Sequence, residues 1–251
     1  MIKLFGVPIS LTSKPQALAL IGEWVREFRA KGQSPKLVVT PNPEMIVAAQ
    51  SDPEFLKALQ SADLAIPDGV GVAWAVRLPS RVSGIDLMEF LILQPQKVGP
   101  FELKVMLLGG RPGVAAQAAA SLLRNLKSEI LNLKFKTLSG PPDIENTTPH
   151  ELNQLIKQIN LFSPDLLFVA FGHGRQEKWL TANREQLTAG VAMGVGGALD
   201  QIADPSLRPP AYINSIGLGW LYRLIREPWR WKRQLALVKF AGMVLQERLK
   251  S

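Results

Sequence analysis

Short apolar runs alternate with amphipathic stretches along most of the chain. The runs rich in Val, Leu and Ile predict seven strands, at 4–9, 37–40, 64–66, 105–108, 133–138, 166–171 and 191–195. Between them apolar positions recur at helical spacing, for example over 14–30, which Gly32 ends, and over 114–126. Strands that alternate with helices are typical of a parallel sheet covered on both faces. We therefore predict an α/β fold, with a Rossmann-like, mostly parallel sheet.

This alternation stops near residue 208. The sequence Arg208-Pro209-Pro210 breaks the pattern, and the residues after it have helical periodicity without a further strand. Pro228 predicts two helices here, because proline fits the first turn of a helix but not its interior. We therefore predict an α/β domain over 1–207 and a helical C-terminal appendage over 208–251.

Most of the positive charge lies in this appendage. The net charge is +8, and residues 219–251 contribute +6 of it. Four arginines follow one another at spacings of three, four and three, which predicts one basic helical face: Arg223, Arg226, Arg230 and Arg233. Aromatic residues are interleaved with them: Trp220, Tyr222, Trp229 and Trp231. Aromatic rings beside guanidinium groups are typical of a helix at an anionic membrane surface.

Composition narrows the class of protein. A chain of 251 residues with 47% hydrophobic content can bury a full core. The sequence has no cysteine, which excludes disulfides and thiolate metal sites and suits a reducing compartment. Residues 1–10 are too short an apolar stretch for a secretion signal, and no apolar run reaches the ~18 residues of a membrane span.

Glycines and polar residues follow five of the predicted strands, at 40–43, 67–69, 109–113, 172–177 and 196–200. Ligands of open parallel sheets bind beyond the carboxyl ends of the strands, so these segments predict a site. Gly109-Gly110, before the helix at 114, best fits a backbone anion site at a helix N-terminus. It matches neither a Walker loop nor a dinucleotide fingerprint, and each glycine pair alone is equally explained by a tight turn.

Asp68 has two interpretations. It fits the N-cap of a helix beginning at Val70, a role worth about 1 kcal/mol. It also fits a general base, which needs a carboxylate held by rigid neighbours and open to substrate. A metal site or a histidine-dependent triad is not expected, because there is no Asp-x-Asp pair and His150 and His173 are far apart in sequence.

Together these segments resemble a known family. The stretches are TPNPEMIVAAQSDPEFLKALQSADLAIPDGVGVAWA, RVSGIDL, LLGGRPGVA, GRQEKW, GVGGALD and GWLYRLIREPWRWKRQ. In this order, and over nearly the whole chain, they resemble the bacterial WecG/TagA/CpsF glycosyltransferases, glycosyltransferase family 26. Three departures stand out. Gly174 replaces the proline of the family's Gly-x-Pro-Lys-Gln-Glu, and Gly219 replaces a glutamate. Ala203-Asp204 and Arg208-Pro209-Pro210 stand where the family has Ala-Gly before a basic Arg-Ala-Pro.

The resemblance implies an inverting transferase without metal or cofactor. Such an enzyme moves an N-acetylhexosamine-type sugar, N-acetylmannosamine-like, from a UDP-sugar to a polyprenyl-diphosphate-linked saccharide in cell-surface polysaccharide synthesis. It works in the cytoplasm, peripherally bound to the inner face of the membrane through its appendage. The resemblance also implies roles for individual residues. Asp68 matches the catalytic base. Residues matching substrate contacts are Thr40, Asn42, Arg81, Gln176, Arg223, Arg230 and Arg233, and the nucleotide is expected at Gly109, Gly110, Gly196 and Gly197.

Three alternatives stay open. A relative with the same chemistry could take UDP-glucose or a UDP-uronic acid for exopolysaccharide. A non-enzymatic module could bind nucleic acid through the basic, tryptophan-rich appendage, although this leaves the residues around Asp68 unexplained, so we expect no nucleic acid partner. The appendage could instead be the interface of a homo-oligomer.

Overall fold

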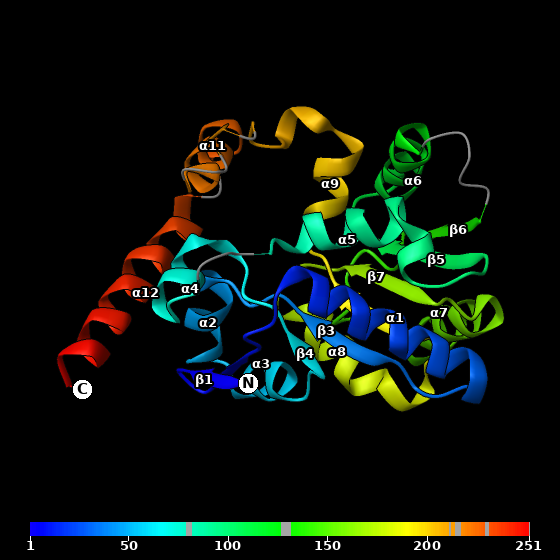
Figure 1. The fold of residues 1–251 in the computed structure, drawn as a ribbon, viewed down its shortest axis with the longest axis horizontal. Coiled ribbons are helices and arrows are strands. Elements are labelled where there is room, and N and C mark those ends of the chain that lie inside the picture. The colour runs from blue at the N-terminus through cyan, green and yellow to red at the C-terminus, as the bar shows by residue number, and fades with distance from the viewer. Residues whose placement is uncertain (79–81, 127–131, 211, 214–216, 229–230, 251) are drawn as a thin grey trace.

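The chain forms a parallel sheet between layers of helices (Figure 1). The computed structural model describes the chain except for residues 79–81, 127–131, 211, 214–216, 229–230 and 251. In the described part the main sheet has six strands, in the spatial order β4 (Leu64–Ala65), β3 (Lys36–Val39), β8 (Val191–Gly194), β7 (Leu166–Ala170), β5 (Leu103–Gly109) and β6 (Leu133–Leu138). All neighbouring strands run parallel. The predicted fold class is confirmed.

Side chains along each strand alternate between two cores. On β5, Val105 and Leu107 pack into one cluster, whereas Met106 and Leu108 pack into another. The first face is covered by α1 (Lys14–Lys31), α5 (Gly84–Leu93), α6 (Val114–Asn125) and α9 (Ala198–Ala203). The second is covered by α7 (Pro149–Phe162) and α8 (Arg175–Asn183), beside which lie α2 (Pro43–Ala49) and α3 (Pro53–Gln60). Burial on both faces explains why the inner strands are mostly apolar, whereas the edge strand β6 is only partly buried and carries two lysines.

Capping residues set the ends of α1. The Ser13 hydroxyl accepts the Gln16 N–H, and the Gln16 side chain accepts the Ser13 N–H. At the other end Gly32 adopts a φ of 63° and donates its N–H to the Phe28 carbonyl. These are the ordinary start and stop signals of a helix, and the predicted helix is confirmed.

The predicted strand over 4–9 is wrong. The chain instead forms a hairpin of β1 (Ile2–Leu4) and β2 (Val7–Ile9), which pair antiparallel outside the main sheet. Phe5 and Gly6 turn the chain between them, with φ values of 50° and 80°. The glycine allows this left-handed turn, which the apolar pattern did not indicate. The other six predicted strands are confirmed to within two residues at either end.

The C-terminal part contains α11 (Gly219–Arg226) and α12 (Trp231–Lys250), so the predicted division near Pro228 is confirmed. The predicted single basic face is wrong, because Arg223 and Arg226 lie on α11 whereas Arg233 lies on α12. α12 packs back on α2 and α4 (Gly69–Ala75) (Figure 1). In the described residues no helix is both long and apolar enough to cross a membrane. The domain boundary at 207/208 stays a prediction.

Candidate active site

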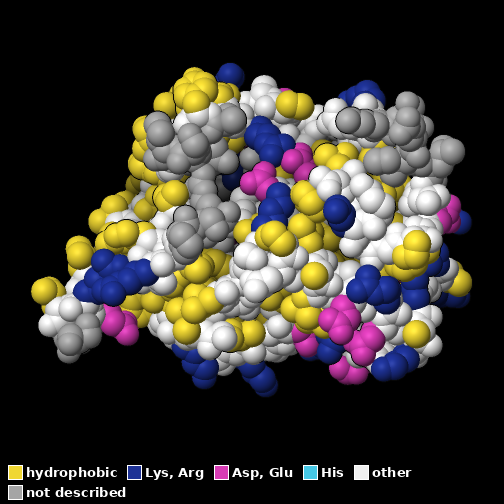
Figure 2. Space-filling view, viewed as in Figure 1, with side chains coloured by type: hydrophobic (Ala, Val, Ile, Leu, Met, Phe, Trp, Pro, Cys, Tyr) yellow, Lys and Arg dark blue, Asp and Glu magenta, His cyan; other side chains and the backbone are white. Residues whose placement is uncertain are grey.

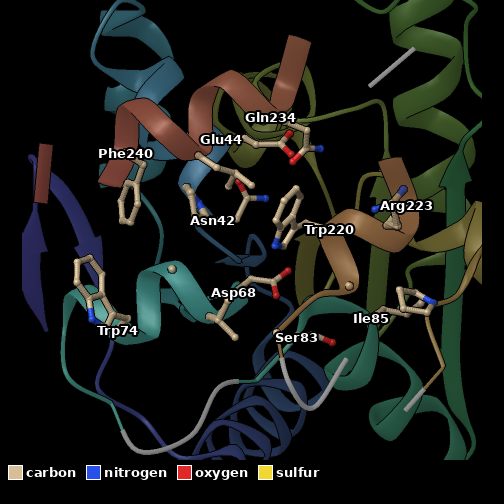
Figure 3. Close-up of a pocket in the computed structure, with 18 of the residues that line it drawn as sticks. Asn42, Glu44, Asp68, Trp74, Ser83, Ile85, Trp220, Arg223, Gln234 and Phe240 are labelled. Carbon is tan, nitrogen blue, oxygen red and sulfur yellow. The ribbon is translucent and has the colours of Figure 1, made fainter. Parts of the chain in front are cut away.

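A cavity of about 440 Å³ lies where the strand-end segments meet the C-terminal helices (Figure 3). Its walls come from the segments after β3 and β4, the start of α5, α9, α11 and α12. The polar and charged side chains that line it are Asn42, Glu44, Asp68, Ser83, Asp86, Gln201, Arg208, Arg223 and Gln234. The carboxyl edge of the sheet thus carries the site that the sequence predicts there.

Asp68 lies at the centre of this cavity (Figure 3). Its backbone N–H donates to the Pro41 carbonyl at 2.9 Å, which ties the segment after β4 to the segment after β3. Asp68 occupies the N-cap position of α4, yet its side chain makes no capping hydrogen bond. The Gly84 N–H instead approaches Asp68 Oδ2 at 3.5 Å. The capping interpretation therefore does not account for the carboxylate, whereas the general-base interpretation fits its position.

The two predicted residues after β3 lie differently. Asn42 lines the cavity and caps α2, because its Oδ1 accepts the Met45 N–H at 2.9 Å. Thr40 does not line the cavity but packs behind it: a Cβ added to Gly84 would stand 3.0 Å from Thr40 Oγ1. Since Gly84 also contacts Asp68, Thr40 supports the wall on which the carboxylate rests.

Arg208 forms a charged wall that the sequence did not predict. Its guanidinium donates to both carboxylate oxygens of Glu89, at 2.6 and 2.7 Å, and to Asp86 at 2.9 Å. Burial disfavours the charge, but these two carboxylates outweigh it and raise the pKa of Arg208 above its usual value. Asp86 belongs to the RVSGIDL stretch and Arg208 begins the Arg208-Pro209-Pro210 break, but no local pattern indicated that residues 122 positions apart would pair.

Among the described side chains of the predicted appendage arginines, that of Arg223 lines the cavity (Figure 3). Its guanidinium bonds Glu227 at 3.1 Å and lies beside the turn after β8, where a Cβ added to Gly197 would be 3.4 Å from Arg223 Nη2. Arg81 and Arg230 fall outside the described residues. The backbone of Arg233 lies in α12, and its side chain falls outside the described part of the structure.

Gln176 and Glu177 are buried below the turn after β8, with 3% and 2% exposure, and do not line the cavity. Gln176 Nε2 donates to Glu177 Oε1 at 2.7 Å, while Gln176 Oε1 accepts the Gly196 N–H at 3.0 Å. The Gly174 N–H donates to Glu177 Oε2 at 2.7 Å. Burial raises the pKa of Glu177 to about 7 against the lowering effect of these hydrogen bonds. The pair joins the ends of β7 and β8.

Two of the backbone N–H groups in the predicted glycine loops are already bonded within the protein. The Gly110 N–H donates to the Ala170 carbonyl at 2.9 Å, and the Gly196 N–H is taken by Gln176. The prediction that the Gly110 N–H faces a phosphate is therefore wrong. Gly109 is buried and has a φ of 99°, and a Cβ added to it would stand 2.8 Å from the Ala170 oxygen. Gly110 lines a second cavity of about 340 Å³ together with Arg111 and Arg175.

Comparison with known proteins then decides the family. A sequence model described as "Glycosyl transferase WecG/TagA/CpsF family" matches residues 2–251. The chain belongs to this glycosyltransferase family. It is similar to an N-acetylglucosaminyldiphosphoundecaprenol N-acetyl-β-D-mannosaminyltransferase of Bacillus subtilis, with 32% identity over 216 residues that cover 84% of this chain and 79% of the relative. A protein of the same name from Staphylococcus aureus is 31% identical over 241 residues, covering 92% and 86%.

The described side chains of this glycosyltransferase do not form a cluster of metal ligands. Within the described residues, no three or more His, Cys, Asp or Glu side chains gather as they would around a metal ion. The cavity carboxylate of Asp86 is already paired with Arg208.

Aromatic side chains also line the cavity. The sequence predicted one of them, Trp220, as a residue at a membrane surface and indicated no role for the others. Trp220 stands across from Asp68 in Figure 3, while Trp74 and Phe240 lie to one side. Trp74 was visible in the GVGVAWA stretch of the sequence. Phe240 comes from α12, and no local pattern indicated that this helix folds back against α4.

Proposed function

We propose that this glycosyltransferase moves an N-acetylmannosamine-like sugar from a UDP-sugar to a polyprenyl-diphosphate-linked saccharide. The names of the relatives support this acceptor class and this sugar. The observation that carries the proposal is the position of Asp68, whose side chain does not cap its helix and which lines the same cavity as Trp220 and Arg223. Metal independence and inversion are part of the proposal and rest on the family resemblance.

In the proposed reaction Asp68 acts as the general base. The acceptor hydroxyl gives its proton to the Asp68 carboxylate while its oxygen forms a bond to the anomeric carbon of the donor. The bond from that carbon to the diphosphate oxygen breaks, and UDP leaves from the opposite face with the electron pair. This inverts the anomeric centre. General-base catalysis of this kind contributes typically ~10²–10⁴ in rate.

Arg223 is the cation proposed to meet the departing diphosphate. It lies at the cavity wall next to Gly197, at the start of α9. A guanidinium group favours negative charge there. The second cavity is proposed to take the nucleoside, because the Arg111–Asp200 ion pair, at 3.1 Å, links its wall to α9.

The appendage is proposed to bind the inner face of the membrane. Hydrophobic side chains gather over the C-terminal helices in Figure 2, and among the exposed ones are Ile225, Leu235, Val238 and Leu245. Sedimentation with anionic liposomes tests this: the double change L235S/V238S should weaken binding several-fold, and L161S on α7 should not. Salt-sensitive binding to oligonucleotides but not to liposomes would instead favour the nucleic acid alternative.

The decisive experiment for the donor measures UDP release from a panel of UDP-sugars, with and without a polyprenyl-diphosphate-N-acetylglucosamine acceptor and with a chelator present. We expect acceptor-dependent release with UDP-N-acetylmannosamine that the chelator leaves unchanged. Turnover of UDP-glucose or a UDP-uronic acid alone would replace the proposed donor, and absence of acceptor-dependent release from every donor would refute the proposal.

A further inference from the structure

The strand that leads to the proposed base is short and lies at the edge of the sheet. β4 has two residues, Leu64–Ala65, and is the outermost strand of the described main sheet on its side. β3 holds its inner side: the Ile66 N–H donates to the Val39 carbonyl at 2.9 Å, and the Asp68 N–H donates to the Pro41 carbonyl at 2.9 Å. On the outer side the described main sheet has no further strand, so the backbone groups that face outward need another partner.

Ser10 is that partner. Its N–H donates to the Ala65 carbonyl at 2.7 Å, and its hydroxyl oxygen accepts the Ala65 N–H at 3.1 Å. One residue thus satisfies both backbone groups of Ala65 and takes the place of a neighbouring strand. Ser10 is 5% exposed and Ala65 is 0% exposed, so both bonds are shielded from solvent.

Ser10 directly follows the N-terminal hairpin, which is itself fixed to the body of the protein. Gln60 Nε2 of α3 donates to the Gly6 carbonyl at 3.0 Å, and Gln50 Nε2 at the end of α2 donates to the Phe5 carbonyl at 3.1 Å. All three residues of β2 are buried, and this strand packs against α3 and β4 (Figure 1). The hairpin is therefore a rigid support for the outer edge of β4.

We propose that Ser10 is a positioning residue for the general base: it fixes the end of β4, and thereby the place of the Asp68 carboxylate, without contacting substrate. The inference rests on the proposed function. Asp68 follows Ala65 by only three residues. Between them Ile66 is 1% exposed and Pro67 has a restricted φ, so a shift of Ala65 displaces Asp68 as well. Misplacing a reacting group by about 1 Å can cost ~10²-fold in rate.

Acceptor-dependent UDP release by S10A tests the proposal in the full chain. Alanine removes the acceptor and leaves the buried Ala65 N–H unpaired, so the strand end must shift or admit water. We expect kcat to fall about tenfold while the KM for each substrate stays within about twofold, because Ser10 does not line the cavity. S10C, which keeps a small side chain but has only a weakly accepting sulfur, should change kcat in the same direction.

A double-mutant cycle with D68N separates positioning from a general loss of structure. If Ser10 acts through the Asp68 carboxylate, S10A should not lower the residual rate of D68N further, whereas damage to the fold would lower the rate equally in both backgrounds. The matched control is S121A on α6. Ser121 is also a buried serine, 6% exposed, and its hydroxyl accepts from Arg124 Nη2 at 2.9 Å. We expect S121A to keep the kcat of the parent.

An unchanged kcat in S10A and S10C would overturn the proposal. An equal loss of kcat in S121A, or an equal further loss in the D68N background, would also overturn it. A near-normal rate in D68N alone would refute the proposed base and with it this inference. A low rate in D68N beside a normal rate in S10A would remove only the role of Ser10, so the two failures are distinguishable.

Discussion

The side-chain amide of Gln176 donates to the buried carboxylate of Glu177 at 2.7 Å, directly above the end of β8. Through its oxygen, Gln176 also fixes the Gly196 N–H, and the adjoining Gly197 lies beside Arg223. A buried pair that does not line the Asp68 cavity thus positions the turn that carries a proposed diphosphate contact. Gln176 is therefore a positioning residue in this structure rather than the direct substrate contact that the resemblance implies.

Stability should depend on the protonation of Glu177. Burial raises the pKa of Glu177 to about 7 from an ordinary value of 4.5, so the folded chain binds this proton more tightly than the unfolded chain. The free energy of unfolding should therefore fall as pH rises from about 4.5 to about 7, by up to ~1.4 kcal/mol per pH unit. Denaturant titrations across this range should show the slope in the parent and a smaller one in E177Q. The same slope in both proteins would contradict this assignment.

A methyl group at Gly194 should destabilise the fold. A Cβ there would stand 2.6 Å from Gln176 Nε2 and 2.8 Å from Glu177 Oε1, and neither side chain has room to withdraw because both are buried. Overpacking of this kind costs about 1–3 kcal/mol, so G194A should lower the free energy of unfolding by that amount. Gly242 of α12 is the matched control, since a Cβ there meets nothing within 4 Å and G242A should stabilise by roughly 0.5–1 kcal/mol. A stable, fully active G194A would show that the pair does not need this glycine.

Loss of the Arg208 pairing should affect activity more than stability. The Arg208 and Glu89 side chains are 38% and 21% exposed, and pairs in such partly exposed settings contribute about 1 kcal/mol or less. However, Arg208 ties the chain that leads into the C-terminal helices to α5, whose first residue contacts Asp68. We expect R208Q to raise the KM for both substrates several-fold while the free energy of unfolding changes little. K31Q, which breaks the exposed Lys31–Glu27 pair, is the control; equal kinetic constants in both variants would argue against a role for Arg208.

Local signals predicted most of the sheet and the central residue of the site. The apolar runs locate the inner strands of the main sheet because burial on both faces demands them. The Pro-Asp-Gly turn after β4 places Asp68 at the edge where ligands bind. The hairpin at residues 2–9 escaped prediction because its turn depends on a left-handed Phe5-Gly6 pair. The Arg208–Asp86 contact and the return of Phe240 toward α4 depend on long-range packing, which no local pattern encodes.

The central claim is that Asp68 is the base, and the rate of acceptor-dependent UDP release by D68N tests it most directly. Asparagine keeps the size of the side chain, so the fold and donor affinity should persist while the rate falls by ~10²–10⁴. D204N, at an exposed carboxylate, should match the parent. Near-normal release by D68N would contradict the account and return Asp68 to a structural role.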